Sequence, residues 1–134
     1  MATKMVVVFN NIPGLPGKLR ERAQAAAQTA ALLTEQEIKA DMEQSKSGRT
    51  YKRGSKLHKA SAAGESPAID SGALYSSVQT DTDINSITAA VFTNAEQAEI
   101  LEFGGVHMEP RPFMTPAVAK IRPVFFKLMK EVLK

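Results

Sequence analysis

The sequence predicts a small α+β protein in which a small antiparallel sheet packs with a long N-terminal helix and a C-terminal helix. A β-branched run near the N-terminus and two later runs around a polar turn indicate strands. A long segment rich in Ala, Leu, Glu, Gln and Lys indicates the first helix, and apolar residues at spacings of three and four indicate the last one. With 134 residues, we expect one domain spanning residues 1–134.

The first two elements follow from local composition. Met5 to Phe9, MVVVF, is typical of a strand, and the Asn and Pro-Gly pairs after it indicate a turn. From Gly17 to about Ser45 we expect a long helix with a smooth alanine stripe, which could pack inside the protein or against another subunit. Thr34 with Glu37 matches a capping box that could interrupt this helix, and we favour a continuous helix.

Residues 46–65 predict a long, mobile basic loop, because the segment is polar, contains glycine and serine, and lacks hydrophobic periodicity. Long loops in small domains often carry function. The loop holds six basic residues that could dock an acidic partner surface, contact DNA phosphates or remain solvated. They are Lys46, Arg49, Lys52, Arg53, Lys56 and Lys59.

Short elements follow the loop. Asp70 or Ser71 can cap a helical turn entered through Gly72 and running through Leu74 and Tyr75. Residues 78–82 and 87–93 predict a hairpin around a polar turn at 83–86. Residues 94–103 predict a short helix that ends at Gly104.

In that short helix we place Ala98, Leu101 and Ile100 inward, and assign Leu101 and Phe103 to the core. Glu102 is expected to be an exposed acid between two apolar anchors. It could pair with Arg111, either within one subunit or across to a neighbouring one.

Pro110 and Pro112 predict an extended path into the last helix. Thr115 and Pro116 fit an N-cap and first turn, and Phe113 with Met114 would lock this helix to the sheet. Pro123 should kink the helix or delay its regular start. The expected apolar face consists of Val118, Ile121, Phe125, Leu128 and Val132.

Charge is distributed unevenly along the chain. Residues 60–110 contain eight acidic residues and no Lys or Arg, whereas the rest contains all 17 basic residues and six acidic ones. These opposite charges could complement one another between copies of the chain, or pair within one copy and face water.

Three phrases stand out in order: SPAIDSGALYSSV at 66–78, AEILEFGG within 95–105, and PRPFMTPA at 110–117. Together they resemble the tail-completion family of long-tailed bacteriophages, and the order of elements is similar over nearly the full chain. The residues that carry the resemblance are Ser71, Gly72, Leu74, Leu101, Phe103, Gly104, Pro112, Phe113 and Pro116.

The resemblance implies a structural virion protein of the phage neck that joins a DNA-filled head to a tail. It implies a homo-oligomeric ring, with six copies by analogy, stacked between head-closure and tail-terminator or tail-tube proteins around a DNA channel. Assembly would take place in the host cytoplasm, without membrane contact. The candidate partner-binding residues are those of the basic loop together with Asp70, Glu102 and Arg111.

Other functions are less well supported by the residues. The chain has no Cys and only two His residues, so no metal site, cofactor or catalytic set is expected, and we expect no enzyme activity. The short apolar run at the N-terminus predicts no secretion signal, and no apolar stretch is long enough to span a membrane. The alternatives are a tail terminator or another neck ring, and a sequence-independent DNA-binding accessory protein.

Overall fold

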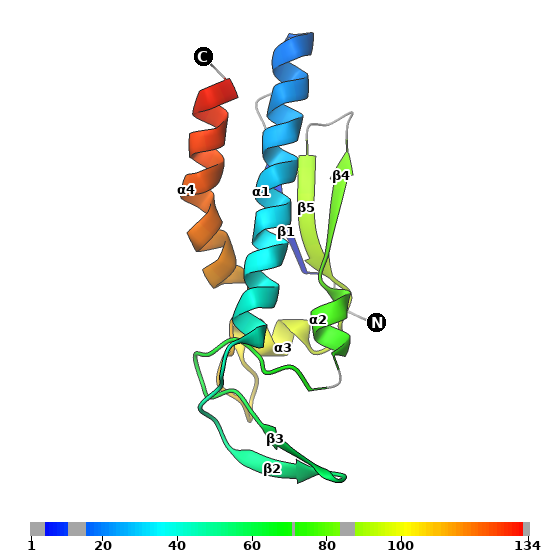
Figure 1. Cartoon of the computed structure of the whole chain (residues 1–134), viewed down its shortest axis with the longest axis vertical. Coiled ribbons are helices and arrows are strands. Elements are labelled where there is room, and N and C mark those ends of the chain that lie inside the picture. The colour runs from blue at the N-terminus through cyan, green and yellow to red at the C-terminus, as the bar shows by residue number, and fades with distance from the viewer. Residues whose placement is uncertain (1–4, 11–15, 71, 84–87, 133–134) are drawn as a thin grey trace.

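The computed structural model describes residues 5–10, 16–70, 72–83 and 88–132. It has the expected α+β architecture, with a long N-terminal helix, a C-terminal helix and two small antiparallel sheets (Figure 1). The elements are β1 (Met5–Asn10), α1 (Gly17–Glu43), β2 (Thr50–Arg53), β3 (Lys56–Lys59), α2 (Ala73–Ser77), β4 (Gln79–Asp83), β5 (Thr88–Thr93), α3 (Ala98–Phe103) and α4 (Met114–Val132).

The larger sheet has the strand order β1-β5-β4, and both pairings are antiparallel. Side chains of β5 alternate, so that Ala89, Val91 and Thr93 are buried while the residues between them are half-buried. On β4 the inward-facing Thr80 donates a hydrogen bond to Glu35 of α1 at 2.5 Å. One face of the sheet therefore packs on α1. The predicted turn at 83–86 lies mostly outside the described residues.

Helix α1 is continuous, as expected, and Thr34 does not restart it. The Thr34 hydroxyl instead donates to the carbonyl of Ala30, at 2.8 Å, within the same helix. The alanine stripe is buried between the sheet and α4, because α1 lies between these two layers (Figure 1). This close packing uses the stripe inside the protein.

Helix α4 begins at Met114, so the prediction that Thr115 is its N-cap is wrong: Thr115 lies in the first turn. Phe113 and Met114 are buried, as expected of anchors. The helix continues across Pro123. Of the expected apolar face, Ile121 and Val132 are buried and the other three residues are half-buried.

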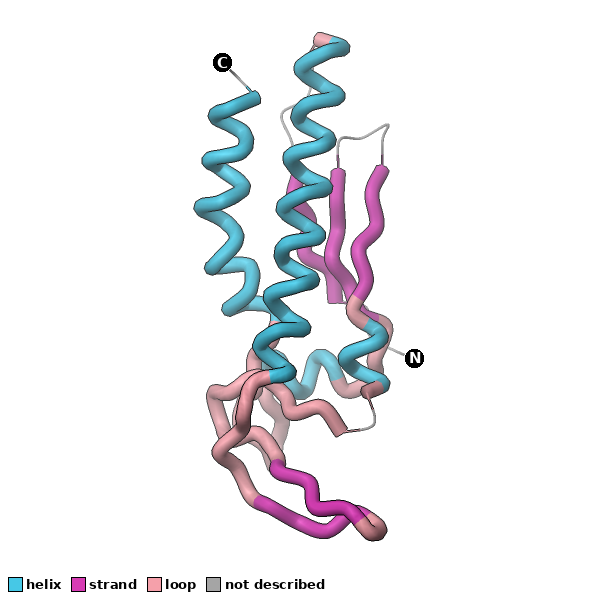
Figure 2. Tube along the Cα trace, in the orientation of Figure 1, coloured by secondary structure: helices cyan, strands magenta, loops and turns pink. Residues whose placement is uncertain are grey.

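The expected basic loop contains a β-hairpin that sequence analysis missed. Strands β2 and β3 pair from Thr50↔Lys59 to Arg53↔Lys56 around the two-residue turn Gly54-Ser55. Gly54 has a φ of 65°, a value favoured by glycine and typical of tight hairpin turns. The hairpin projects beyond the C-terminal end of α1 (Figures 1 and 2).

The two short helices differ from expectation in detail. Gly72, with a φ of 85°, occupies the N-cap position of α2. Capping by Asp70 stays a prediction, and Ser71 lies outside the described residues. Helix α3 ends at Gly104 as expected, where the Gly104 amide donates to Ile100 at 2.8 Å.

The core assignment of α3 is wrong for two residues. Ile100 is 51% exposed and Phe103 is 68% exposed, whereas Ala98 is buried. The inward face is Ala98, Leu101 and Glu102, at the spacing of three and four that places residues on one side of a helix. Phe103 lies off that face.

Candidate assembly interface

Glu102 is a buried acid whose carboxylate is surrounded by hydrogen-bond donors. Its side chain is buried, and its carboxylate accepts hydrogen bonds from the backbone amides of Phe113, Met114 and Thr115 at 2.8, 3.0 and 2.8 Å. The Thr115 hydroxyl adds a fourth bond at 2.5 Å. The first amides of a helix have no partner within the helix, and a negative charge there is favourable. Glu102 therefore caps α4, and the expectation that it is an exposed acid is wrong. Within this chain its carboxylate binds the start of α4 rather than Arg111, and a pair with Arg111 of a neighbouring subunit stays a prediction.

Arg111 has a different role. Its guanidinium Nε donates to the carbonyl of Ser61 at 3.1 Å, and its backbone amide donates to Leu101 at 2.6 Å. Nearby, the amide of Gly64 donates to Pro110 at 3.0 Å. Arg111 thus ties the segment before α4 to α3 and to the chain that leaves the hairpin.

We define the hairpin root as residues 46–49 and 60–66, the two chain segments that connect the hairpin to the body. Gly48 donates to the carbonyl of Ala60 at 3.0 Å, and Ala60 donates to Arg49 at 2.9 Å. A Cβ on Gly48 would lie 2.4 Å from the Ala60 oxygen and 2.6 Å from the Ser61 oxygen. Only glycine allows the two segments to approach this closely.

Glu65 joins the two segments of the hairpin root through hydrogen bonds. Its carboxylate accepts hydrogen bonds from the Ser47 hydroxyl, from the Ser47 amide at 3.1 Å and from the Ala62 amide at 2.8 Å. These bonds favour the charged form and lower the pKa of Glu65 from 4.5 to about 2. The root therefore depends on an ionised Glu65.

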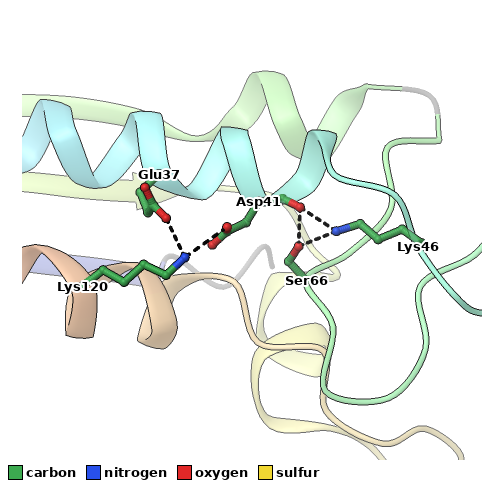
Figure 3. A network of polar contacts seen from close by, with 5 residues as sticks. All are labelled: Glu37, Asp41, Lys46, Ser66 and Lys120. Carbon is green, nitrogen blue, oxygen red and sulfur yellow. Dashed lines mark hydrogen bonds and ion pairs between the residues drawn. The ribbon is translucent and has the colours of Figure 1, made fainter.

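Lys46 is part of the same root. Its ammonium donates to the Asp41 carbonyl and to the Ser66 hydroxyl, each at 2.6 Å, and Ser66 donates to the same carbonyl at 2.7 Å (Figure 3). Burial lowers the pKa of Lys46, opposed by the charges of Glu65 and Asp41. Lys46 thus binds a backbone carbonyl at the C-terminal end of α1. Near the same end, Lys120 of α4 binds the carboxylates of Glu37 and Asp41. Because the bonds to Asp41 and Ser66 hold its ammonium group within the chain, Lys46 differs from the exposed Lys52, Lys56 and Lys59 of the hairpin.

The remaining basic residues lie on or beside the hairpin. Arg49, Lys52, Lys56 and Lys59 have exposed side chains, and Arg53 ends β2. The described residues of the hairpin and of the segment before it thus include several exposed basic side chains.

Tyr51 and His58 face the body rather than solvent alone. Their rings meet edge to face at 5.2 Å, and His58 Nδ1 lies 4.0 Å from Asp70 Oδ1. Asp70, predicted as a partner-binding residue or a helix cap, therefore faces the hairpin.

A groove of about 350 Å³ separates the hairpin from the body. Its lining includes residues of all three phrases that resemble the phage family, together with Tyr51 and His58 of the hairpin. Those residues include Pro67 and Leu74 from the first phrase, Leu101 from the second and Arg111 from the third. The first phrase and the two later phrases, which are separated by the β4–β5 hairpin in sequence, therefore meet at one groove.

Large apolar side chains are exposed at this same end of the molecule. Leu57 of the hairpin is 73% exposed, and Val106, just after α3, is 95% exposed. Ile100 and Phe103 of α3 add to them. Exposed apolar groups in such number next to basic ones are typical of a surface that a partner covers.

Across the described ranges, no group of three His, Cys, Asp or Glu residues could hold a metal ion. The hydroxyl of Ser77 donates a hydrogen bond to the Leu74 carbonyl at 2.7 Å and shares another with the Thr93 hydroxyl at 2.6 Å. In the described part of the chain, no helix has both the length and the apolar character needed to cross a membrane.

No protein-family profile matches the chain, and neither the curated proteins nor the solved structures contain a match to it.

Proposed function

We propose that this chain is a structural subunit of a phage neck, a ring protein that helps join a DNA-filled head to a tail. The observation that carries the proposal is that the three phrases resembling the tail-completion family line one groove, beside an exposed basic hairpin. Their meeting supports a shared role for the three phrases.

The contacts between the phrases support the same proposal. Glu102 of the second phrase holds the helix start of the third, and Arg111 of the third binds both Leu101 and the chain that leaves the hairpin. The hairpin root is therefore bound by Arg111, a residue of the third phrase. In this proposal the phrases form a base that presents the hairpin to a partner.

The surface chemistry fits binding rather than catalysis. The exposed side chains at this end include Lys52, Lys56 and Lys59 of the hairpin and the apolar residues Leu57, Phe103 and Val106. Apolar and cationic groups side by side suit a protein interface, in which burial of the apolar groups drives association and the charges select the partner. We therefore propose contacts with neighbouring ring proteins, and a location in the virion neck.

Electron microscopy of particles made when this gene is disabled in its phage tests the proposal, with complementation by the intact gene as the control. Full heads beside complete, unattached tails are expected. Tails of uncontrolled length would move the protein to the terminator position. Normally joined particles would contradict a neck role.

A DNA-binding accessory role is the second candidate, and the exposed lysines of the hairpin favour it. Binding to phosphates releases counterions, so affinity for DNA would be independent of sequence and would fall steeply with salt. Titration of a short duplex at two salt concentrations separates the candidates. Tight, salt-sensitive binding by the isolated protein favours the accessory role, and weak binding favours the neck.

A further inference from the structure

The hairpin has two chemically different faces. Residues that pair across antiparallel strands lie on the same face, and successive residues alternate. Because Tyr51 and His58 form one pair and face the groove, the pairs Lys52↔Leu57 and Thr50↔Lys59 lie on the opposite side. We call these four residues the outer hairpin face; all four are exposed, and Leu57 lies between two lysines.

The larger sheet presents a complementary surface. On β4, Gln79, Asp81 and Asp83 are exposed, whereas Thr80 between them faces α1. In register beside them on β5 are Phe92 and Ala90, both half-buried. We call these five residues the acidic sheet face. It carries two acids next to apolar groups, on the side of the sheet that faces away from α1.

The spacing of charges agrees between the two faces. Asp81 and Asp83 are two residues apart on one strand, which separates their Cα atoms by about 7 Å. Lys52 and Lys59 are diagonal neighbours across the hairpin, a relation that corresponds to about 7–8 Å. On each face an apolar residue lies directly opposite one of the charged residues: Leu57 opposite Lys52, and Ala90 opposite Asp81. Two ion pairs and an apolar contact can therefore form together.

The two faces belong to opposite parts of one molecule. The hairpin projects beyond the end of α1, and α2 and α3 lie between it and β4 (Figures 1 and 2). The hairpin root is fixed by Glu65, Lys46 and Gly48, so the arm does not fold back on the sheet of its own chain. A contact between the two faces must join different copies.

We propose that the outer hairpin face of one copy binds the acidic sheet face of the next copy. This inference rests on the proposed function and names the partner of the hairpin as a second copy of this chain. The contact joins two different surfaces, so each copy has one of each to offer. Repetition of such a head-to-tail contact produces a closed ring when the rotation between copies closes.

Cysteine crosslinking gives the direct test, because the chain has no cysteine of its own. Two single variants, Lys52→Cys and Asp81→Cys, are mixed and oxidised, and the products are separated on a non-reducing gel. A mixed 52–81 dimer is expected to exceed both self-dimers. In the matched control, Glu21→Cys takes the place of Asp81→Cys. Glu21 is an exposed acid at the end of α1 away from the hairpin, so only background crosslinking is expected.

Charge reversal tests the chemistry of the contact. Lys52→Glu and Asp81→Lys are each expected to reduce self-association at least tenfold in sedimentation velocity, and the chain that carries both changes should regain it. The matched control is Lys56→Glu, which makes the same charge change on the groove side of the hairpin. We expect it to change association little. Circular dichroism confirms that each variant is folded.

Three outcomes would overturn the inference: no 52–81 product above the Glu21 control, no recovery in the double variant, or equal losses from Lys52→Glu and Lys56→Glu. The last result would indicate general attraction to an acidic partner or DNA. The phage experiment above reports on the neck role separately. If the 52–81 crosslink forms but disabling the gene still leaves heads joined to tails, the contact between copies would stand and the proposed neck role would be rejected.

Discussion

The two sheets of this protein show two ways of fixing antiparallel strands. In the β1-β5-β4 sheet, side chains of β5 alternate between half-buried and buried, and the buried ones pack on α1. In the β2–β3 hairpin, the described side chains are exposed except for the half-buried His58. Apolar burial stabilises the β1-β5-β4 sheet, whereas polar contacts at the hairpin root hold the β2–β3 hairpin in place. The larger sheet is thus part of the core, whereas the hairpin is largely exposed.

The largest expected loss of stability is at the start of α4. Glu102→Ala leaves three backbone amides without their acceptor, and we expect the free energy of unfolding to fall by about 3 kcal/mol. Urea denaturation followed by circular dichroism measures it. Glu99→Ala, an exposed acid of the same helix, is the control and should change stability by about 0.5 kcal/mol or less. Equal effects would contradict the capping role.

Gly48→Ala should open the hairpin without unfolding the body. The added methyl group clashes with the Ala60 and Ser61 carbonyls, so we expect a local cost of about 1–3 kcal/mol at the hairpin root. Hydrogen exchange at the Ala60 amide should become faster while the amides of β5 stay protected. Gly17→Ala meets nothing within 4 Å and is the control. Faster exchange throughout the protein would show that the hairpin is part of the core.

Acid should loosen the hairpin root before the body. The pKa of Glu65 is lowered from 4.5 to about 2 by its hydrogen bonds, so its contribution is fully present above pH 4.5. The contribution declines as pH falls through this range and is lost below about 2. NMR titration of the Ser47 and Ala62 amides should report the transition. Glu65→Gln, which removes the titrating group, should abolish it; a transition that persists would assign it to another acid.

Phe103→Ala should have the smallest effect on stability, below about 0.5 kcal/mol, because the ring is 68% exposed. The buried Phe113 provides the contrast, since Phe113→Ala removes a ring from the core and should cost about 4 kcal/mol. Thermal denaturation of both variants measures the difference. A large loss from Phe103→Ala would restore that residue to the core.

The sequence predicts the body well because its patterns are local. The alanine-rich stripe and the three-and-four spacing of Ile121 and its neighbours suffice to identify both long helices. The hairpin was missed because lysines replace the alternating apolar residues that usually mark strands. Its one signal was Gly54-Ser55, a two-residue glycine turn of the kind that joins paired strands.

The candidate site was harder to predict than the fold, since its contacts join distant segments. Nothing near Glu102 in sequence indicates that it caps a helix that starts at Met114, because that depends on how α3 meets α4. Phe103 and Leu101 are equally apolar, and only the rotation of a six-residue helix decides which is covered. Charge and composition did identify the basic segment. They did not indicate that the Lys46 side chain binds the Asp41 carbonyl at the end of α1.

We propose that the hairpin serves assembly, whereas the buried core of the body serves stability. The most direct test of this proposal is the variant Lys52→Glu with Lys59→Glu, measured both for its free energy of unfolding and for complementation of the phage in which this gene is disabled. We expect unchanged stability together with full heads and unattached tails. Restored joining of heads to tails by this variant, or a loss of stability comparable to that of Glu102→Ala, would contradict it.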